Sequence, residues 1–261
     1  EEEAWRVEGL ISASSTTTVV GARKVGKTTF TYNMLNSYLH GTPQLGAFPT
    51  NPVVRRLGYV NMELTKKQSK KWFRRSPIGS SDKVTVWNLR GMPNPFRSDA
   101  SLKKFAAEAR ADDIEVMFID PFSGVYTGNG KKSIDNDEVK EFLLKLEAFK
   151  VEANISELVI LVHAGWDGSR SRGASALEDH PDTIITLEAD KQQNRFISAI
   201  GRDVEIEEGM VKFDKTTGLL TYTTGGKKVT GIDVARNKII STLRKFPSIN
   251  AGQLQLSLIH I

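Results

Sequence analysis

The spacing of apolar residues along the chain predicts strands and helices in alternation. Buried strands rich in Val, Ile, Leu and Thr are expected at 16–20, 56–62, 83–89, 114–120 and 157–162. Between them, apolar positions at helical spacing predict helices over 29–39, 100–111 and 135–154. Alternation of this kind is typical of an α/β fold with a mostly parallel central sheet flanked by helices.

The C-terminal part of the chain has a different pattern. Strands are expected at 182–187 and 196–200, and alternation over 204–224 predicts a β-hairpin with its turn at 216–218. We therefore divide the chain into a large domain over 1–224 and a smaller part over 225–261. In the smaller part a linker leads to the start of a truncated helical appendage, for which a winged-helix-type module is one interpretation. The sequence begins without Met and ends inside an apolar stretch, so we expect both ends to be cut.

Composition is that of a soluble globular protein. Of the 261 residues, 39% are hydrophobic and 26% are charged. No apolar run approaches the ~18 residues of a membrane span, and no basic-then-apolar leader opens the sequence, so we expect a cytoplasmic protein without membrane contact. The absence of cysteine excludes disulfides and zinc–thiolate sites. The formal charge of +5 permits a polyanionic partner without requiring one.

The segment V-V-G-A-R-K-V-G-K-T-T over 19–29 has the G-x-x-x-x-G-K-T pattern of a phosphate-binding loop. The glycines let the backbone wrap around phosphate oxygens, Lys27 reaches the β- and γ-phosphates, and the Thr28 hydroxyl ligates Mg²⁺. Because a strand is predicted before the loop and a helix after it, a chance match in an ordinary loop is the weaker interpretation. The residues expected to bind the nucleotide are Gly21, Ala22, Arg23, Lys24, Val25, Gly26, Lys27, Thr28 and Thr29.

Polar residues follow three other predicted strands. Asp120 ends I-E-V-M-F-I-D, as in a Walker B strand, and is expected to hold Mg²⁺ with Thr28; a turn-forming Asp is the plain alternative. Glu63 is expected to polarise the attacking water, unless it only begins a helix. His163 is expected to sense the γ-phosphate, although a lone histidine is more often structural.

Three segments carry cations that suit a nucleic-acid contact. In T-K-K-Q-S-K-K-W-F-R-R over 65–75, paired cations share one helix face; we favour a plain solvated helix over a phosphate-backbone or subunit contact. The loop at 122–133 fits contact with a single strand as well as it fits a plain surface loop, and its candidate nucleic-acid residues are Tyr126, Lys131 and Lys132. The loop at 164–175 is a second polar, Gly/Ser-rich loop and carries Arg170 and Arg172.

The ordered set of motifs resembles a RecA-fold P-loop ATPase of the replicative-helicase-like group, closest to the RepA-like ATPases of plasmids and phages. The resemblance covers about 5–222 and rests on G-A-R-K-V-G-K-T-T, Y-V-N-M-E, V-M-F-I-D, L-V-H, R-G-A-S-A-L-E-D-H-P-D and G-R-D. It implies a RecA-like fold, hydrolysis of ATP with Mg²⁺, and a homo-oligomeric ring, usually a hexamer, with ATP at each subunit interface.

The resemblance also implies roles for single residues. Glu63 matches the family's catalytic glutamate and His163 its polar sensor, while the loops at 122–133 and 164–175 match channel loops that contact single-stranded DNA. Arg202 matches the arginine that reaches into a neighbour's active site, and Arg172 is a weaker rival. Where ring helicases often have a lysine two residues before that arginine, this chain has Ile200. The expected catalytic residues are Lys27, Glu63, His163 and Arg202.

Three functions remain open at this point. The first is a DNA-stimulated ring motor in plasmid or phage replication, which the sequence favours. The second is a recombination- or repair-type filament ATPase of the same fold, and the third is an ATP-gated binding or signalling module. A small-molecule kinase fits less well, because no Arg-rich lid segment or separate acceptor pocket is evident in the sequence.

Overall fold

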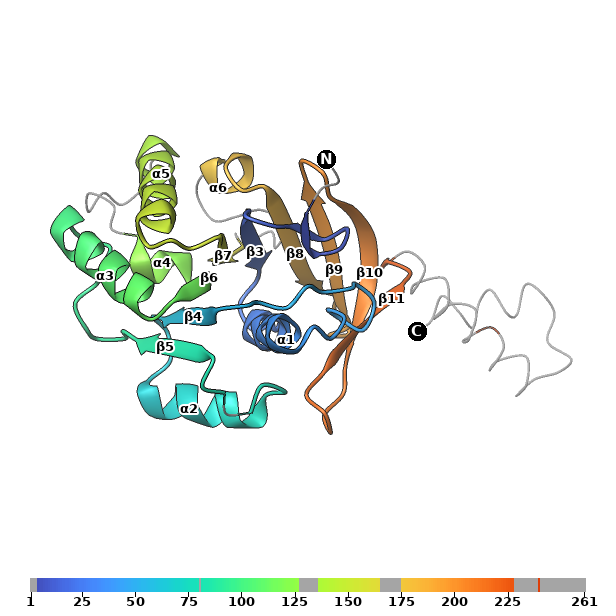
Figure 1. Cartoon of the computed structure of the whole chain (residues 1–261). Helices are drawn as coiled ribbons and strands as arrows, with labels where there is room; N and C mark the ends of the chain where they lie inside the picture. Colours follow the sequence, from blue (N-terminus) through green and yellow to red (C-terminus); the bar gives the residue numbers. More distant parts are fainter. Residues whose placement is uncertain (1–3, 80, 127–135, 165–174, 228–238, 240–261) are drawn as a thin grey trace, which may run out of the picture.

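The computed structural model describes residues 4–79, 81–126, 136–164, 175–227 and 239. A nine-stranded sheet with the order β11-β10-β9-β8-β3-β7-β6-β4-β5 forms its centre (Figure 1). The strands of this sheet are β3 (Thr16–Gly21), β4 (Arg56–Asn61), β5 (Val84–Asn88), β6 (Ile114–Asp120), β7 (Glu157–His163), β8 (Thr183–Ala189), β9 (Arg195–Gly201), β10 (Glu205–Phe213) and β11 (Leu220–Thr224). The predicted α/β fold is confirmed.

The strands fall into a parallel part and an antiparallel part. β8, β3, β7, β6, β4 and β5 run parallel to one another, and β9, β10 and β11 continue the sheet in antiparallel fashion from β8. β3 and β6 are buried along their whole length. Continuous burial of this kind is what a parallel sheet covered on both faces requires, and it explains the apolar runs in the sequence.

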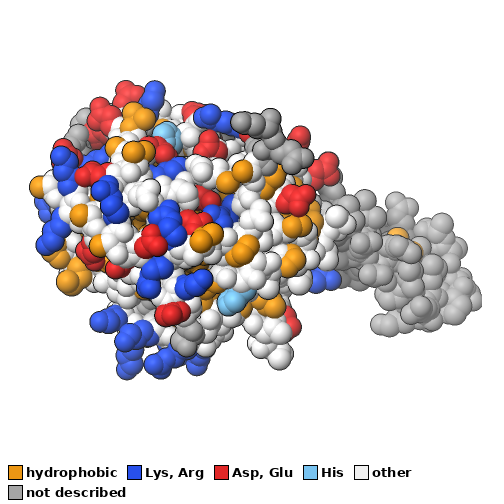
Figure 2. Space-filling model, viewed as in Figure 1, with side chains coloured by type: hydrophobic (Ala, Val, Ile, Leu, Met, Phe, Trp, Pro, Cys, Tyr) orange, Lys and Arg blue, Asp and Glu red, His pale blue; other side chains and the backbone are white. Residues whose placement is uncertain are grey.

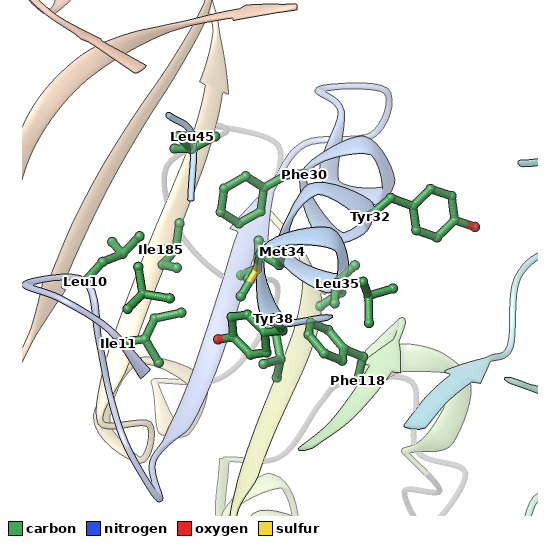
Figure 3. Packing of buried hydrophobic residues seen from close by; sticks show 14 of the residues in the cluster. Leu10, Ile11, Phe30, Tyr32, Met34, Leu35, Tyr38, Leu45, Phe118 and Ile185 are labelled. Carbon is green, nitrogen blue, oxygen red and sulfur yellow. The ribbon is translucent and has the colours of Figure 1, made fainter. Parts of the chain in front are cut away.

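Helices cover both faces of the parallel part. The helices are α1 (Lys27–His40), α2 (Lys66–Arg75), α3 (Asp99–Ala111), α4 (Phe122–Val125), α5 (Asn136–Glu152) and α6 (Ala176–Asp179). On one face, Phe30, Met34, Leu35 and Tyr38 of α1 belong to one apolar cluster with the sheet, in which the Tyr38 ring lies 5.8 Å from that of Phe118 (Figure 3). A second apolar cluster joins α3 and α5 to the other face.

Strand alternation explains how one segment serves both clusters. Phe118 of β6 belongs to the cluster under α1, whereas its neighbours Met117 and Ile119 belong to the cluster under α3 and α5. Successive side chains of a strand point to opposite faces, so a strand buried on both sides must be apolar at every position. Asp120 is two residues after Phe118 and therefore lies on the α1 face.

The basic segment forms α2, which lies apart from the other helices at the lower edge of the view in Figure 1. Thr65 begins the helix with a capping box, in which its hydroxyl accepts from the backbone N–H of Gln68 and the Gln68 side chain accepts from the Thr65 N–H. Such a box satisfies two of the otherwise unpaired donors at a helix start. The lysine and arginine side chains of α2 gather at the same edge in the space-filling view (Figure 2).

A buried ion-pair network ties the N-terminal hairpin to the sheet. The hairpin consists of β1 (Trp5–Val7) and β2 (Ile11–Ser12). The guanidinium of Arg6 lies 2.9 Å from Glu157 and 2.5 Å from Glu115, at the starts of β7 and β6. Burial raises the pKa of Glu157 to about 7, although Arg6 opposes that shift. This network was not predicted, because the three residues are far apart in the sequence.

Several boundaries differ from the prediction. The loop expected from 122 begins with the short helix α4, because Phe122 and Val125 turn into the second apolar cluster. The hairpin of β10 and β11 is confirmed, with Phe213 paired to Leu220 around its turn. The predicted helix at 233–246 and nearly all of the appendage lie outside the described residues. Within the described part of the chain, the helices are too short or too polar to cross a membrane.

Candidate nucleotide-binding site

The phosphate loop connects β3 to α1, as predicted. Gly26 has φ of 110°, a conformation that favours glycine, and it precedes the first residue of the helix. At Gly21 the limit is space, since a Cβ would lie 2.8 Å from both the carbonyl oxygen of Leu187 and a methyl carbon of Val25. The backbone conformation thus favours glycine at position 26, and close packing requires it at position 21.

Lys27 points back into its own loop. Its Nζ donates to the carbonyl oxygens of Gly21 at 2.5 Å and Ala22 at 3.0 Å, and lies 3.1 Å from Nδ1 of His163. Burial lowers the pKa of Lys27 to about 8, while the carboxylates of Asp120 and Glu63 oppose the shift. A phosphate beside this amine would favour its charged form.

Asp120 ends β6 and is buried. The Tyr59 hydroxyl donates a hydrogen bond to its Oδ2, and the side chains share a face because Tyr59 pairs with Phe118 in the register. Burial raises the pKa of Asp120 to about 6, which the Tyr59 hydrogen bond and Lys27 partly oppose, and the charge of Glu63 adds to the rise. A cation at this carboxylate would favour its ionised form.

This chemistry fits Mg²⁺. The described residues contain no cluster of three or more His, Cys, Asp or Glu side chains that could cage a metal. Mg²⁺ does not need such a cage, because it is usually bound by one or two carboxylates together with substrate phosphates and water. The buried Asp120, beside the loop that carries Thr28, supplies a carboxylate of that kind.

Glu63 lies just after β4 and is exposed. The buried side chain of Asn61 fixes the backbone there: its Oδ1 accepts from the N–H groups of Glu63 at 3.2 Å and Leu64 at 2.8 Å, and its Nδ2 donates to the Leu64 carbonyl and to Asn88. Sequence reasoning missed Asn61. The available signal in the sequence was the side-chain amide of Asn61, two residues before the acid Glu63 at the end of a predicted strand.

The register places these groups at one edge of the sheet. Asn61 pairs with Asp120, and Gly21 pairs with His163. The carboxyl ends of β3, β4, β6 and β7 therefore meet, which is where open α/β sheets bind ligands. The sequence-predicted residues Lys27, Asp120, Glu63 and His163 all belong to this edge.

Arg195, the first residue of β9, and Arg202, which directly follows β9, lie at opposite edges of the sheet. Gly201 pairs with Thr183 near the start of β3, so Arg202 is remote from the phosphate loop of its own chain; it is 72% exposed and lies 3.6 Å from Asp182. Arg195 lies at the loop edge, where its Nε donates to the Val25 carbonyl at 2.8 Å. Sequence reasoning missed Arg195, because its place depends on the strand pairing.

The predicted nucleic-acid residues are only partly described. Lys131, Lys132, Arg170 and Arg172 lie outside the described residues. Tyr126 packs against Phe122 and Phe142, with ring centroids 5.4 Å away in each case. It also donates a long hydrogen bond of 3.4 Å to Glu138. Its contact with nucleic acid stays a prediction.

Comparison with known protein families gives a match for this chain. The family model described as an AAA domain matches residues 1–169, which include the phosphate loop, Glu63, Asp120 and His163. The chain belongs to the AAA domain family. A search of curated protein sequences found no match to this AAA domain.

A solved structure supports the fold independently. The crystal structure of the KaiC-like protein PH0186 from Pyrococcus horikoshii OT3 matches with a TM-score of 0.61 and 16% identity, over 84% of this chain and 94% of that protein. At this identity the match establishes the fold alone. The AAA domain described here therefore has a RecA-like α/β fold, with its phosphate loop between β3 and α1.

Proposed function

We propose that this AAA domain hydrolyses ATP with Mg²⁺ and couples hydrolysis to single-stranded DNA, as a helicase-like ring motor in replication. The observation that carries the proposal is the convergence of charged groups at one edge of the sheet: the strand register brings the phosphate loop with Lys27 to the same edge as Asp120 and Glu63. One buried cation and two carboxylates beside a phosphate loop are the charges that phosphoryl transfer uses.

Each group has a role that its position supports. Lys27 and the loop amides neutralise the phosphates, and Glu63 orients the water that attacks the γ-phosphate. Thr28 and Asp120 would hold Mg²⁺, which would supply positive charge against the phosphates. His163, 3.1 Å from Lys27, reports the state of the γ-phosphate to the segment that follows β7.

An apolar hollow of about 100 Å³ beside the loop is our candidate for the nucleotide base. Its lining includes Gly26 and Thr29 from the loop and α1, and Leu187, Arg195 and Val211 from β8, β9 and β10. Apolar walls with a few polar groups are typical of ligand pockets. A nucleotide whose base enters this hollow would keep its phosphates within reach of the phosphate loop.

The ring part of the proposal rests on Arg202. An exposed arginine at the edge away from its own phosphate loop is accessible to a neighbouring subunit, and an arginine that completes a neighbour's site contributes orders of magnitude in rate. Subunits carrying Arg202→Ala, mixed into wild-type protein, should therefore lower activity more steeply than in proportion to their fraction. A strictly linear loss would contradict a shared site.

The steady-state ATPase rate with and without a single-stranded oligonucleotide tests the DNA part. Stimulation of severalfold or more, absent in Glu63→Gln, is the expected result. Turnover that DNA does not change would overturn the motor and favour the ATP-gated module. Electron microscopy of the nucleotide-bound protein separates closed rings from the filaments of a recombination-type ATPase.

A further inference from the structure

The cations of α2 form an exposed surface of one charge sign. None of them forms an ion pair with any residue that the structure describes. The exposed cations are Lys66, Lys67, Lys70, Lys71, Arg74 and Arg75. Three of them, Lys67, Lys71 and Arg75, are spaced by four residues and therefore form a row on one side of the helix.

This row adjoins a groove of about 260 Å³. Lys71, Trp72 and Arg75 line it from α2, and Phe213 lines it from the hairpin of β10 and β11. Trp72 is 44% exposed and Phe213 is 43% exposed, so each offers part of its ring to a ligand. Cations alongside exposed aromatic rings are the combination that binds single strands, because phosphates pair with the cations and bases stack on the rings.

The walls of the groove are held in place. Asn33 of α1, itself buried, donates to the Gly218 carbonyl at 3.1 Å and accepts from the Leu220 N–H at 2.9 Å. This clamp fixes the hairpin turn against α1. At Gly218 a Cβ would lie 3.3 Å from Pro77, so the turn also packs against the segment that follows α2.

We propose that the groove between α2 and the β10–β11 hairpin binds single-stranded nucleic acid, with Lys67, Lys71 and Arg75 on the phosphates and Trp72 and Phe213 under the bases. This surface is separate from the two segments at 122–133 and 164–175 that the sequence predicts as channel loops. The proposal deepens the nucleic-acid part of the proposed function and rests on it.

The groove is linked to the hydrolytic groups through packing. Only Leu64 and Thr65 separate Glu63 from the start of α2. On the inner side of the helix, the Phe73 ring lies 5.6 Å from Tyr59, whose hydroxyl donates to Asp120. A single strand of nucleic acid bound along α2 would act on the segment that carries Glu63. Binding there should therefore change the rate of ATP hydrolysis.

The test compares two triple variants with matched changes. Lys67→Gln/Lys71→Gln/Arg75→Gln removes the row on α2. Lys103→Gln/Lys104→Gln/Arg110→Gln removes two lysines and one arginine, also exposed, from α3. Fluorescence anisotropy of labelled oligo-dT and oligo-rU at several salt concentrations measures binding, and the two oligonucleotides distinguish DNA from RNA.

The α2 variant should bind at least about tenfold more weakly, and its slope of log affinity against log salt should be smaller by about 2, at ~0.7 per phosphate contact on a single strand. The α3 variant should stay within about twofold of wild type. Trp72→Ala, which keeps every charge, should weaken binding about fivefold or more through lost stacking. This single variant also keeps the test valid if the triple α2 variant fails to fold.

Equal binding by the two triple variants would overturn the proposal that the groove binds nucleic acid. It would leave the proposed function intact, because DNA could still stimulate the wild-type ATPase. No binding of either oligonucleotide to wild type would overturn both nucleic-acid proposals, with ATP hydrolysis judged separately in the absence of DNA. The proposal would also be overturned if the α2 variant lost affinity for phosphatidylserine vesicles but bound both oligonucleotides as tightly as wild type.

Discussion

The buried hydroxyl of Tyr59 donates a hydrogen bond to Oδ2 of Asp120, so a neighbouring strand holds the carboxylate that ends β6. The two residues are close because Tyr59 pairs with Phe118, and Asp120 is the next side chain on that face of β6. The hydrogen bond opposes the effect of burial, which raises the pKa of Asp120 to about 6. Tyr59 is therefore a positioning residue for the predicted Mg²⁺ ligand.

Tyr59→Phe should raise the Mg²⁺ concentration needed for half-maximal ATPase activity and destabilise the fold by about 1–3 kcal/mol, because a buried acceptor loses its donor. Mg²⁺ titration and urea unfolding measure the two effects. Tyr38→Phe is the control, since the buried Tyr38 hydroxyl has no hydrogen-bond partner in the described part of the chain. An unchanged Mg²⁺ requirement in Tyr59→Phe would argue against the positioning role.

ATP binding should take up a proton at alkaline pH. The pKa of Lys27, about 8 because of burial, lies below its ordinary value of 10.5, so the amine loses its proton as pH rises through 8. Phosphate oxygens favour the charged amine, so binding at pH 9 should draw about one proton from the buffer and binding at pH 7 very little. Affinity should then fall as pH rises above 8.

Isothermal titration calorimetry in two buffers of different ionisation enthalpy measures this uptake directly. The same depressed pKa has a consequence for stability without nucleotide: the unfolded state binds more protons between pH 8 and 10.5, so the wild type should gain stability relative to Lys27→Met over that range. Proton uptake that is equal at pH 7 and pH 9 would contradict the account of Lys27.

Asn61→Ala should lower kcat about tenfold or more with little change in the KM for ATP. The Asn61 side chain holds the backbone at Glu63 and Leu64, and Glu63 is proposed to act on the water and not on the bound phosphates. Steady-state kinetics separates the two parameters. Asn88→Ala, which removes only one partner of Asn61, is the matched control and should keep most activity. A rise in KM alone would place Asn61 in nucleotide binding instead.

Arg6→Met should destabilise the protein by about 3–5 kcal/mol, because it leaves two buried carboxylates without their cation. Arg55→Met should cost less than about 1 kcal/mol, since the partner of Arg55 in its ion pair, Asp113, is 62% exposed. Chemical denaturation of the two variants measures the difference. Equal losses would mean that the Arg6 network contributes no more than a surface pair.

Local sequence patterns were enough to predict the elements that carry the site. The apolar runs predicted the strands. Glu63 and Asp120 follow or end two of these strands, and they were predicted as site residues because the carboxyl ends of parallel strands share an edge. The capping pair of Thr65 and Gln68 likewise depends on residues that are near in sequence, so the start of α2 needed no tertiary information.

Contacts between distant strands could not be predicted from one sequence. The hydrogen bond from Tyr59 to Asp120 depends on the register of β4 against β6. The hydrogen bond from Arg195 to Val25 depends on the antiparallel pairing of β8 with β9, far from Val25 in the sequence. A shift of one residue in either register would turn these side chains to the other face. The Arg6 network was missed for the same reason.

The most direct test of the central claim, that the groups around Lys27, Asp120 and Glu63 hydrolyse ATP, is the rate of phosphate release by Glu63→Gln at saturating Mg²⁺ and ATP. We predict a loss of at least about a hundredfold with nucleotide affinity retained, because Glu63 is proposed to act on the water alone. Glu8→Gln, also an acid near the surface, should match wild type. Release at the wild-type rate in Glu63→Gln would contradict the account.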